Sequence, residues 1–377
     1  MATVILCGCQ TFSFYGQAIR GQYQMMSDRQ PIGKLIAADS TEEKLKGKFE
    51  LILELRKFAE SDLALPTDGH YLNYVDLQRS NVVWNIYAAD ELSLEPKTWW
   101  YPVVGKLSYR GYFKEASAEK MAAKLRKQNY DVYVGGVDAY STLGWFKDPV
   151  LNTFIDSSER RLASLIFHEL AHQRLFVAGD TEFNEAFATA VGEEGVRRWM
   201  HAKNDPVQLE RVGKDRDRRK QFVALILETR HQLQAVYESK EPVENKRSRK
   251  AQVLAQLRTN YEQLKQEWNG FDGYDEWFEG PVNNAQLNTI STYYNLVPAF
   301  HQLIQEANGD LDAFYTAASR LTKLSKPERH QRLAEILRKA PAQSVASTRG
   351  GDSLSPLVKK QETSGQVEMR DYSDYRK

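Results

Sequence analysis

Cysteine is scarce in this chain, and both residues, Cys7 and Cys9, lie at its N-terminal end. Their position excludes a core disulfide and a cysteine-based zinc site of ordinary spacing. An excess of charge of one sign is also lacking, because 51 Lys and Arg residues are balanced by 50 Asp and Glu residues, for a net charge of +1. That balance gives no electrostatic reason to expect a nucleic acid partner. Beyond the N-terminus, no segment approaches the roughly 18 apolar residues of a membrane-spanning helix.

The most informative motif is His168-Glu169-Leu170-Ala171-His172, an HExxH pentapeptide. At 3.6 residues per turn, the two histidines leave a helix on one face, about 5–6 Å apart at Cβ. Two ring nitrogens at that spacing can bind one metal ion at roughly 2.0–2.1 Å each. Glu169 is offset around the helix, where its carboxylate can take a proton from a metal-bound water. The pattern is typical of zinc hydrolases.

The surrounding segment, residues 156–176, is predicted to be a buried helix. Its apolar residues cover most of the helix circumference, which indicates a helix in the core. Asp156 followed by Glu159 resembles a capping box, and Ser157 and Ser158 are alternative caps. Both histidines would therefore point into the interior, where a polar group without a partner costs about 1–3 kcal/mol.

A catalytic zinc site needs a third protein ligand, and no further histidine follows closely. The helix breaks at residues 177–180, and Asp180 or Thr181 can cap a new helix to about Met200. Glu185 borders the apolar face of that helix, beside small residues that allow close approach to the first helix. We therefore expect Glu185 to be the third ligand. The competing carboxylates are interpreted as solvated charges: Glu182, Glu193 and Glu194.

Several runs resemble the bacterial predicted-aminopeptidase family, zinc lipoproteins that belong with the gluzincins. They are His168-Glu-Leu-Ala-His-Gln, Asp180-Thr-Glu-Phe-Asn-Glu-Ala-Phe-Ala, Val191-Gly-Glu-Glu-Gly with Trp199, Tyr101-Pro-Val-Val-Gly, Tyr109-Arg-Gly-Tyr-Phe, Ala139-Tyr-Ser-Thr-Leu-Gly-Trp-Phe, Asp148-Pro, and Asn283-Asn-Ala with residues 293–300. The resemblance covers about residues 9–337. It implies a Zn²⁺ cofactor, peptide or protein substrates, His168, His172 and Glu185 as ligands, and Glu169 as general base.

One position departs from the thermolysin-like branch of these peptidases. That branch continues its Asn-Glu motif with an aspartate that orients a ligand imidazole, whereas residues 186–189 here are Ala, Phe, Ala and Thr. The residue that supports the histidines is therefore open.

Peptide hydrolysis also needs a group that stabilises the oxyanion of the tetrahedral intermediate. Tyr293 and Tyr294 are candidates because their predicted helix follows the metal helices, and the resemblance favours Tyr293; His301 is a weaker alternative. An aminopeptidase further needs an acidic residue for the substrate's free α-amine, and Glu182 or Asp138 can serve. Aminopeptidase activity follows from the family alone. The alternatives are a zinc endopeptidase and a non-catalytic envelope lipoprotein that retains a zincin fold.

Residues 1–9 are interpreted as the remnant of a lipoprotein signal, or a truncated one. Leu6-Cys7-Gly8-Cys9 resembles a lipobox in which Cys9 is lipidated, although only eight residues precede it, without Lys or Arg. With Gln10 next in the chain, we expect an outer-membrane lipoprotein of the bacterial cell envelope that faces the periplasm. The alternative is a cytoplasmic protein. The sequence gives no indication of an oligomeric state.

The predicted fold class is α+β, predominantly helical and zincin-like. Residues 10–155 form N-terminal helices and a small mixed β-sheet lobe, residues 156–340 hold the HExxH helix and a helical lobe with an αα-hairpin at 205–268, and 341–377 form a disordered tail. Helices are expected at residues 12–27, 42–58, 117–128, 215–240, 245–268, 283–305, 311–321 and 327–338. Strands are expected at 82–88, 99–104, 109–113, 132–134 and 139–146. The last is a candidate edge strand for substrate pairing, or equally an interior strand.

Overall fold

The computed structural model describes residue 23 and residues 26–101, 105–139 and 147–339. Some expectations therefore lie outside the described residues: the lipobox with Cys9, nearly all of the helix at 12–27, the tail at 341–377, and the candidate edge strand except Ala139. The described ranges include the whole HExxH motif, Glu185 and Tyr293.

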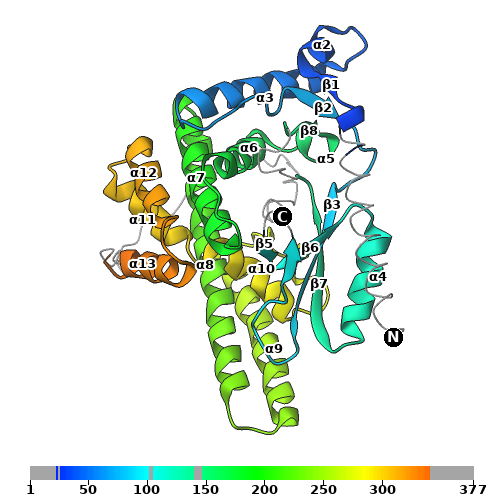
Figure 1. Cartoon of the computed structure of the whole chain (residues 1–377), viewed down its shortest axis with the longest axis vertical. Helices are drawn as coiled ribbons and strands as arrows, with labels where there is room; N and C mark the ends of the chain where they lie inside the picture. Colours follow the sequence, from blue (N-terminus) through cyan, green and yellow to red (C-terminus); the bar gives the residue numbers. More distant parts are fainter. Residues whose placement is uncertain (1–22, 24–25, 102–104, 140–146, 340–377) are drawn as a thin grey trace, which may run out of the picture.

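The described chain is mainly helical, with short strands concentrated in its first half (Figure 1). Its helices are α2 (Ile32–Ala37), α3 (Glu43–Ser61), α4 (Glu115–Arg126), α5 (Asn152–Ile155), α6 (Glu159–Arg174), α7 (Thr181–Ala202), α8 (Pro206–Glu238), α9 (Val243–Glu267), η1 (Glu276–Phe278), α10 (Asn284–Tyr294), α11 (Val297–Glu306), α12 (Leu311–Leu321) and α13 (Lys326–Lys339). Its strands are β1 (Gln30–Pro31), β2 (Asn73–Val75), β3 (Val83–Asp90), β4 (Trp99–Tyr101), β5 (Gly105–Leu107), β6 (Tyr109–Tyr112), β7 (Tyr130–Val137) and β8 (Val150–Leu151). The predicted α+β class is confirmed. In this part of the chain, no helix combines the length and the apolar character that crossing a bilayer requires.

The largest sheet has the order β6-β3-β7, with both pairs antiparallel. Side chains alternate between the faces of a strand, so Trp84, Ile86 and Ala88 of β3 share one face. That face packs against Ala118 and Ala122 of α4 in a separate apolar cluster. The opposite face of β3 and β7 lies against α10, so the sheet is covered by a helix on each side. The described residues also form two smaller sheets, β1-β2-β8 and β4-β5.

Helix α10 joins the sheet to the helical lobe, and Asn284 in its first turn holds the junction. The Asn284 side chain is fully buried, and its Nδ2 lies 2.9–3.1 Å from the carbonyl oxygens of Asp90, Glu91 and Ser93 at the end of β3. Its Oδ1 accepts a hydrogen bond from Tyr237 of α8 at 2.8 Å. One amide thus connects the sheet, α10 and the long hairpin.

The helical lobe is built around α6 and α7, which lie against each other near the centre of the molecule (Figure 1). Helix α3 packs on α6, while α10 and α11 pack on α7. Helices α8 and α9 form a hairpin whose tip extends beyond the rest of the described chain (Figure 1). Residues of all these helices belong to one continuous apolar core.

Most predicted elements are present with shifted ends, but the single helix expected at 283–305 is wrong. The structure divides it into α10 and α11, with Asn295 and Leu296 between them. Pro298 explains the break, because a proline inside a continuous helix removes one hydrogen bond and clashes with the carbonyl four residues earlier. Helix α8 also begins nine residues before the predicted start, where Asp205 accepts a hydrogen bond from Gln208 N and Pro206 occupies the first turn.

The Asn284 junction generates a test of stability. Asn284→Ala removes the buried donor to three carbonyl groups, and we expect it to lower the free energy of unfolding by about 2–3 kcal/mol. Urea denaturation of both proteins measures the difference. Asn245→Ala, at an exposed position of α9, is the matched control and should change stability by less than about 0.5 kcal/mol. Equal effects of the two substitutions would contradict the role of Asn284.

Candidate metal centre

Helix α6 carries the HExxH motif and begins where a serine caps it. Ser158 Oγ accepts a hydrogen bond from Arg161 N, so Ser158, one of the alternatives, is the cap rather than Asp156. Short helix α5 ends immediately before this turn. From residue 161 to residue 172, all side chains except Ser164 are buried. The predicted core helix is confirmed, and it starts three residues later than expected.

Helix α7 packs directly on α6 and presents small residues at the contact. A Cβ at Gly192 would stand 3.2 Å from the carbonyl oxygen of Ser164 and 3.4 Å from Cβ of His168. At Gly195, an added Cβ would come within 2.6 Å of the Phe167 ring. Glycine at these positions therefore lets the backbone of α7 approach the face of α6 next to the motif.

The turn between the two helices is held by Asn184. Its Nδ2 donates to the carbonyl oxygen of Val177, and its Oδ1 accepts from the Val177 N–H, both at 2.8 Å. This pair of bonds fixes the first turn of α7 to the end of the preceding loop. Glu185 is the next residue, so its direction is set by the same contact.

His168, His172 and Glu185 converge on one point in the buried interior. The two Nε2 atoms are 3.2 Å apart, and Oε2 of Glu185 is 3.3 Å from His168 Nε2 and 3.5 Å from His172 Nε2. Donors bound tetrahedrally at 2.0–2.1 Å to one zinc ion lie about 3.3–3.4 Å apart. The triangle therefore fits three ligands of such an ion. In the described part of the chain, this is the group of His, Cys, Asp and Glu residues arranged to hold a metal.

The electrostatics of the site keep Glu185 ionised. Burial by itself would raise the pKa of Glu185, but the charge and hydrogen bond of His172, together with those of His168, outweigh it and lower this pKa to about 2. A metal ligand must be deprotonated to bind. Glu185 is therefore prepared for coordination at any ordinary pH.

The remaining polar groups of the site lie on the same two helices. Glu169 is buried on α6, directly after the first histidine. Nδ1 of His172 and Oγ1 of Thr189 have no hydrogen-bond partner among the residues that the structure describes. No described residue therefore supports the Nδ1 side of the His172 imidazole.

The competing carboxylates on α7 have other partners, and the interpretation of Glu193 and Glu194 as solvated charges is wrong. Glu193 binds His301 of α11 at 2.8 Å and lies 3.4 Å from Arg219 of α8. Glu194 binds Arg197 and Arg198, each at 2.7 Å. Sequence periodicity missed these contacts because the partners of Glu193 come from distant helices. They also place His301, the weaker oxyanion candidate, in hydrogen-bonding contact with Glu193.

Asp180, one of the two predicted caps, begins α7 and has a second role that the sequence did not reveal. Its Oδ1 accepts from Phe183 N, and the buried carboxylate also binds Arg329 and His330 of α13. Burial raises the pKa of Asp180, but the contacts with His330 and the positive charges of Lys326 and Arg329 outweigh this and lower it. The start of α7 is thus fastened to the last described helix.

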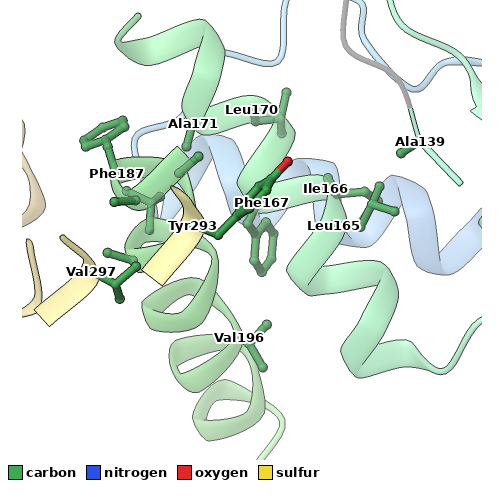
Figure 2. Close-up of a cluster of buried hydrophobic side chains, with 14 of the residues drawn as sticks. Ala139, Leu165, Ile166, Phe167, Leu170, Ala171, Phe187, Val196, Tyr293 and Val297 are labelled. Atoms are coloured by element: carbon green, nitrogen blue, oxygen red, sulfur yellow. The ribbon is translucent and has the colours of Figure 1, made fainter. Parts of the chain in front are cut away.

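The remaining candidates lie in different surroundings. Asp138 forms an ion pair with Arg161 at 2.6 Å, whereas Glu182 accepts a hydrogen bond from Asn295 and lines a pocket. Tyr293 is buried in the main core, and its side chain extends from α10 toward α6 (Figure 2). Its role as the oxyanion-stabilising group stays a prediction.

The family model described as "Putative aminopeptidase" matches residues 13–333. The chain belongs to this family. The family's name indicates a peptidase that acts on peptide substrates. No curated protein and no solved structure matches the chain.

Metal binding by the triad can be measured directly. With zinc as the probe, calorimetry on metal-stripped protein should show one site, and Glu185→Gln should weaken it by on the order of 100-fold or more because a charged ligand is lost. Glu193→Gln is the matched control on the same helix and should retain the site. Loss of zinc in the control, with binding unchanged in Glu185→Gln, would contradict the assignment.

The Glu193 contacts predict a pH-dependent contribution to stability. Burial raises the pKa of Glu193, but the charge of Arg219 and the contact with His301 outweigh it and lower this pKa from 4.5 to about 2. Since the folded pKa is the lower one, the stabilisation is complete above pH 4.5 and is lost as the pH falls toward 2. The stability difference between wild type and Glu193→Gln should be about 1–3 kcal/mol at pH 5.5 and shrink toward pH 3.5.

Urea denaturation at a series of pH values measures this difference. Exposed Glu267→Gln on α9 is the control and should differ little from wild type throughout. A difference for Glu193→Gln that grows as the pH falls would exclude an ionised, paired Glu193.

Proposed function

We propose that this chain is a zinc-dependent aminopeptidase with its metal held by His168, His172 and Glu185. The observation that carries the proposal is the triangle of three buried donors with sides of 3.2–3.5 Å. Two imidazoles and one carboxylate are a common donor set of catalytic zinc, and they leave a fourth position for water or substrate. A structural zinc site would need a fourth protein ligand. Among the described residues, the cluster has three members.

When bound, zinc would supply a Lewis acid that polarises the substrate carbonyl and makes water acidic enough to lose a proton near pH 7. Glu169 supplies the proton transfers. Its carboxylate accepts a proton from the attacking water, and the resulting acid donates that proton to the leaving amine. Because Glu169 neighbours His168 on α6 and is buried, these transfers take place away from bulk solvent.

Recognition of a free amine would distinguish an aminopeptidase from an endopeptidase. Of the two acidic candidates, Asp138 is already paired with the Arg161 guanidinium. Glu182 lies one helical turn before Glu185 on α7 and borders an open pocket. The neighbours of Glu182 are the Asn295 amide at 2.7 Å and His330 Nδ1 at 3.7 Å rather than a guanidinium. These surroundings favour Glu182 as the group that binds the ammonium of the substrate.

The role of Glu169 is tested by Glu169→Gln. This variant should bind one zinc ion like wild type and lose peptide hydrolysis by a factor of at least about 100, because general acid–base transfer contributes about 10²–10⁴-fold. Zinc content and turnover of a peptide library are measured on the same preparations. A wild-type protein that holds zinc and cleaves no peptide in the library would overturn the proposal.

The same library separates the two kinds of peptidase. Peptides with free amines should be cleaved and their N-acetylated counterparts should not. Equal cleavage of both sets would assign the activity to an endopeptidase.

A further inference from the structure

A pocket of about 360 Å³ lies beside α7 and is lined by residues of α7, α8 and α10 and by residues 94–96 after β3. Glu182 is the residue of α7 that lines the pocket. Glu185 follows one turn later on the same helix. Side chains one turn apart on a helix are about 5–6 Å apart at Cβ. The pocket is therefore a neighbour of the metal centre, but its walls contain none of the metal triad.

The pocket wall from α8 contributes a positive charge without an acidic partner. Arg230 is partly buried, and its guanidinium donates to Oδ1 of Asn288. Among the described residues, no carboxylate oxygen lies within 4.0 Å of the Arg230 guanidinium nitrogens, the distance limit for an ion pair. Burial lowers the pKa of Arg230 from its usual value, and the more distant charges of Glu182 and Glu95 oppose this shift. A guanidinium in this position retains donors for an anionic ligand.

Asn288 of α10 adds a second available donor on the same wall. Its side chain is 4% exposed, and Nδ2 has no hydrogen-bond partner in the part of the chain that the structure describes. A buried amide without a partner costs about 1–3 kcal/mol, which a ligand oxygen would recover. Arg230 and Asn288 together form a place for a carboxylate.

Two other polar residues of the pocket carry the opposite charge. Glu182 and Glu95 line it, and Glu182 Oε1 accepts a hydrogen bond from Asn295 at 2.7 Å. Both carboxylates lie more than 4.0 Å from Arg230, yet near enough to influence its pKa. A ligand with an anionic and a cationic group a few ångströms apart would fit between them. Leu94 and Leu227 supply apolar surface beside these charges.

We propose that this pocket binds a free aliphatic α-amino acid, with its carboxylate on Arg230 and Asn288 and its ammonium on Glu182. The carboxylate of the ligand pairs with the cationic wall, and its ammonium pairs with the acidic wall. An aliphatic side chain packs against Leu94 and Leu227. An aminopeptidase releases such amino acids, so the ligand is a reaction product; this last identification rests on the proposed function. Binding itself needs neither zinc nor hydrolysis.

Calorimetric titration of the full chain with L-leucine, L-leucinamide and N-acetyl-L-leucine tests the proposal. L-Leucine should bind one site, and blocking either end should weaken binding at least tenfold. Because amino acids also chelate zinc, the titration is repeated after the metal is removed, and binding should persist. Loss of leucine binding when the metal is removed would overturn the proposal. Binding of leucinamide and N-acetyl-leucine as tight as that of leucine would also overturn it.

Two substitutions then assign the ends of the ligand. Arg230→Met should abolish the preference for leucine over leucinamide and retain the preference over N-acetyl-leucine, whereas Glu182→Gln should do the reverse. Arg211→Met, at an exposed position of the same helix α8, is the control and should bind leucine like wild type. Unchanged preferences in the first two variants would place the amino acid elsewhere.

The failure of this proposal can be told apart from failure of the proposed function. Leucine binding by metal-free protein, without peptide cleavage by the zinc form, would support the pocket and reject the peptidase. Peptide cleavage without leucine binding would do the opposite.

Discussion

The close contact between α6 and α7 is the constraint on which the candidate metal centre depends. Gly192 faces the Ser164 carbonyl oxygen and the Cβ atom of His168. Because glycine has no side chain, α7 can approach α6 closely at this point. Glu185 lies two turns earlier on α7, and its reach to both histidines requires that approach. Ligand distances tolerate errors of only a few tenths of an ångström. A methyl group at Gly192 would thus act on the candidate metal centre by pushing the backbone of α7 away from α6.

The parts of the site that could be predicted from sequence are those encoded within a few residues. The two histidines follow the helical repeat, Asp180 caps the next helix, and Glu185 follows Asn184 in the first turns of that helix. Each of these signals concerns one turn of helix, where spacing determines direction. The α+β class could be predicted for the same reason, because the alternation of β3 and the helical period of the later segments are local patterns.

What could not be predicted depends on segments that meet only after folding. Arg230 and Asn288 are 58 residues apart, and each looks like an ordinary polar residue of a helix. Asn284 binds the end of a strand more than 190 positions before it. Glu193 resembles a surface charge until α8 and α11 are packed on it. Pro298 is the exception, since its effect is local and the break between α10 and α11 could have been predicted from it.

The carboxylate of Asp180 also connects the metal centre to the order in which the chain is synthesised. Its partners Arg329 and His330 are about 150 residues further along the chain. When both histidines and Glu185 have already been synthesised, Arg329 and His330 have not. Asp180 is then without these two partners. Helix α7 therefore reaches its final anchoring only after about 150 further residues have been synthesised and α13 has folded onto it.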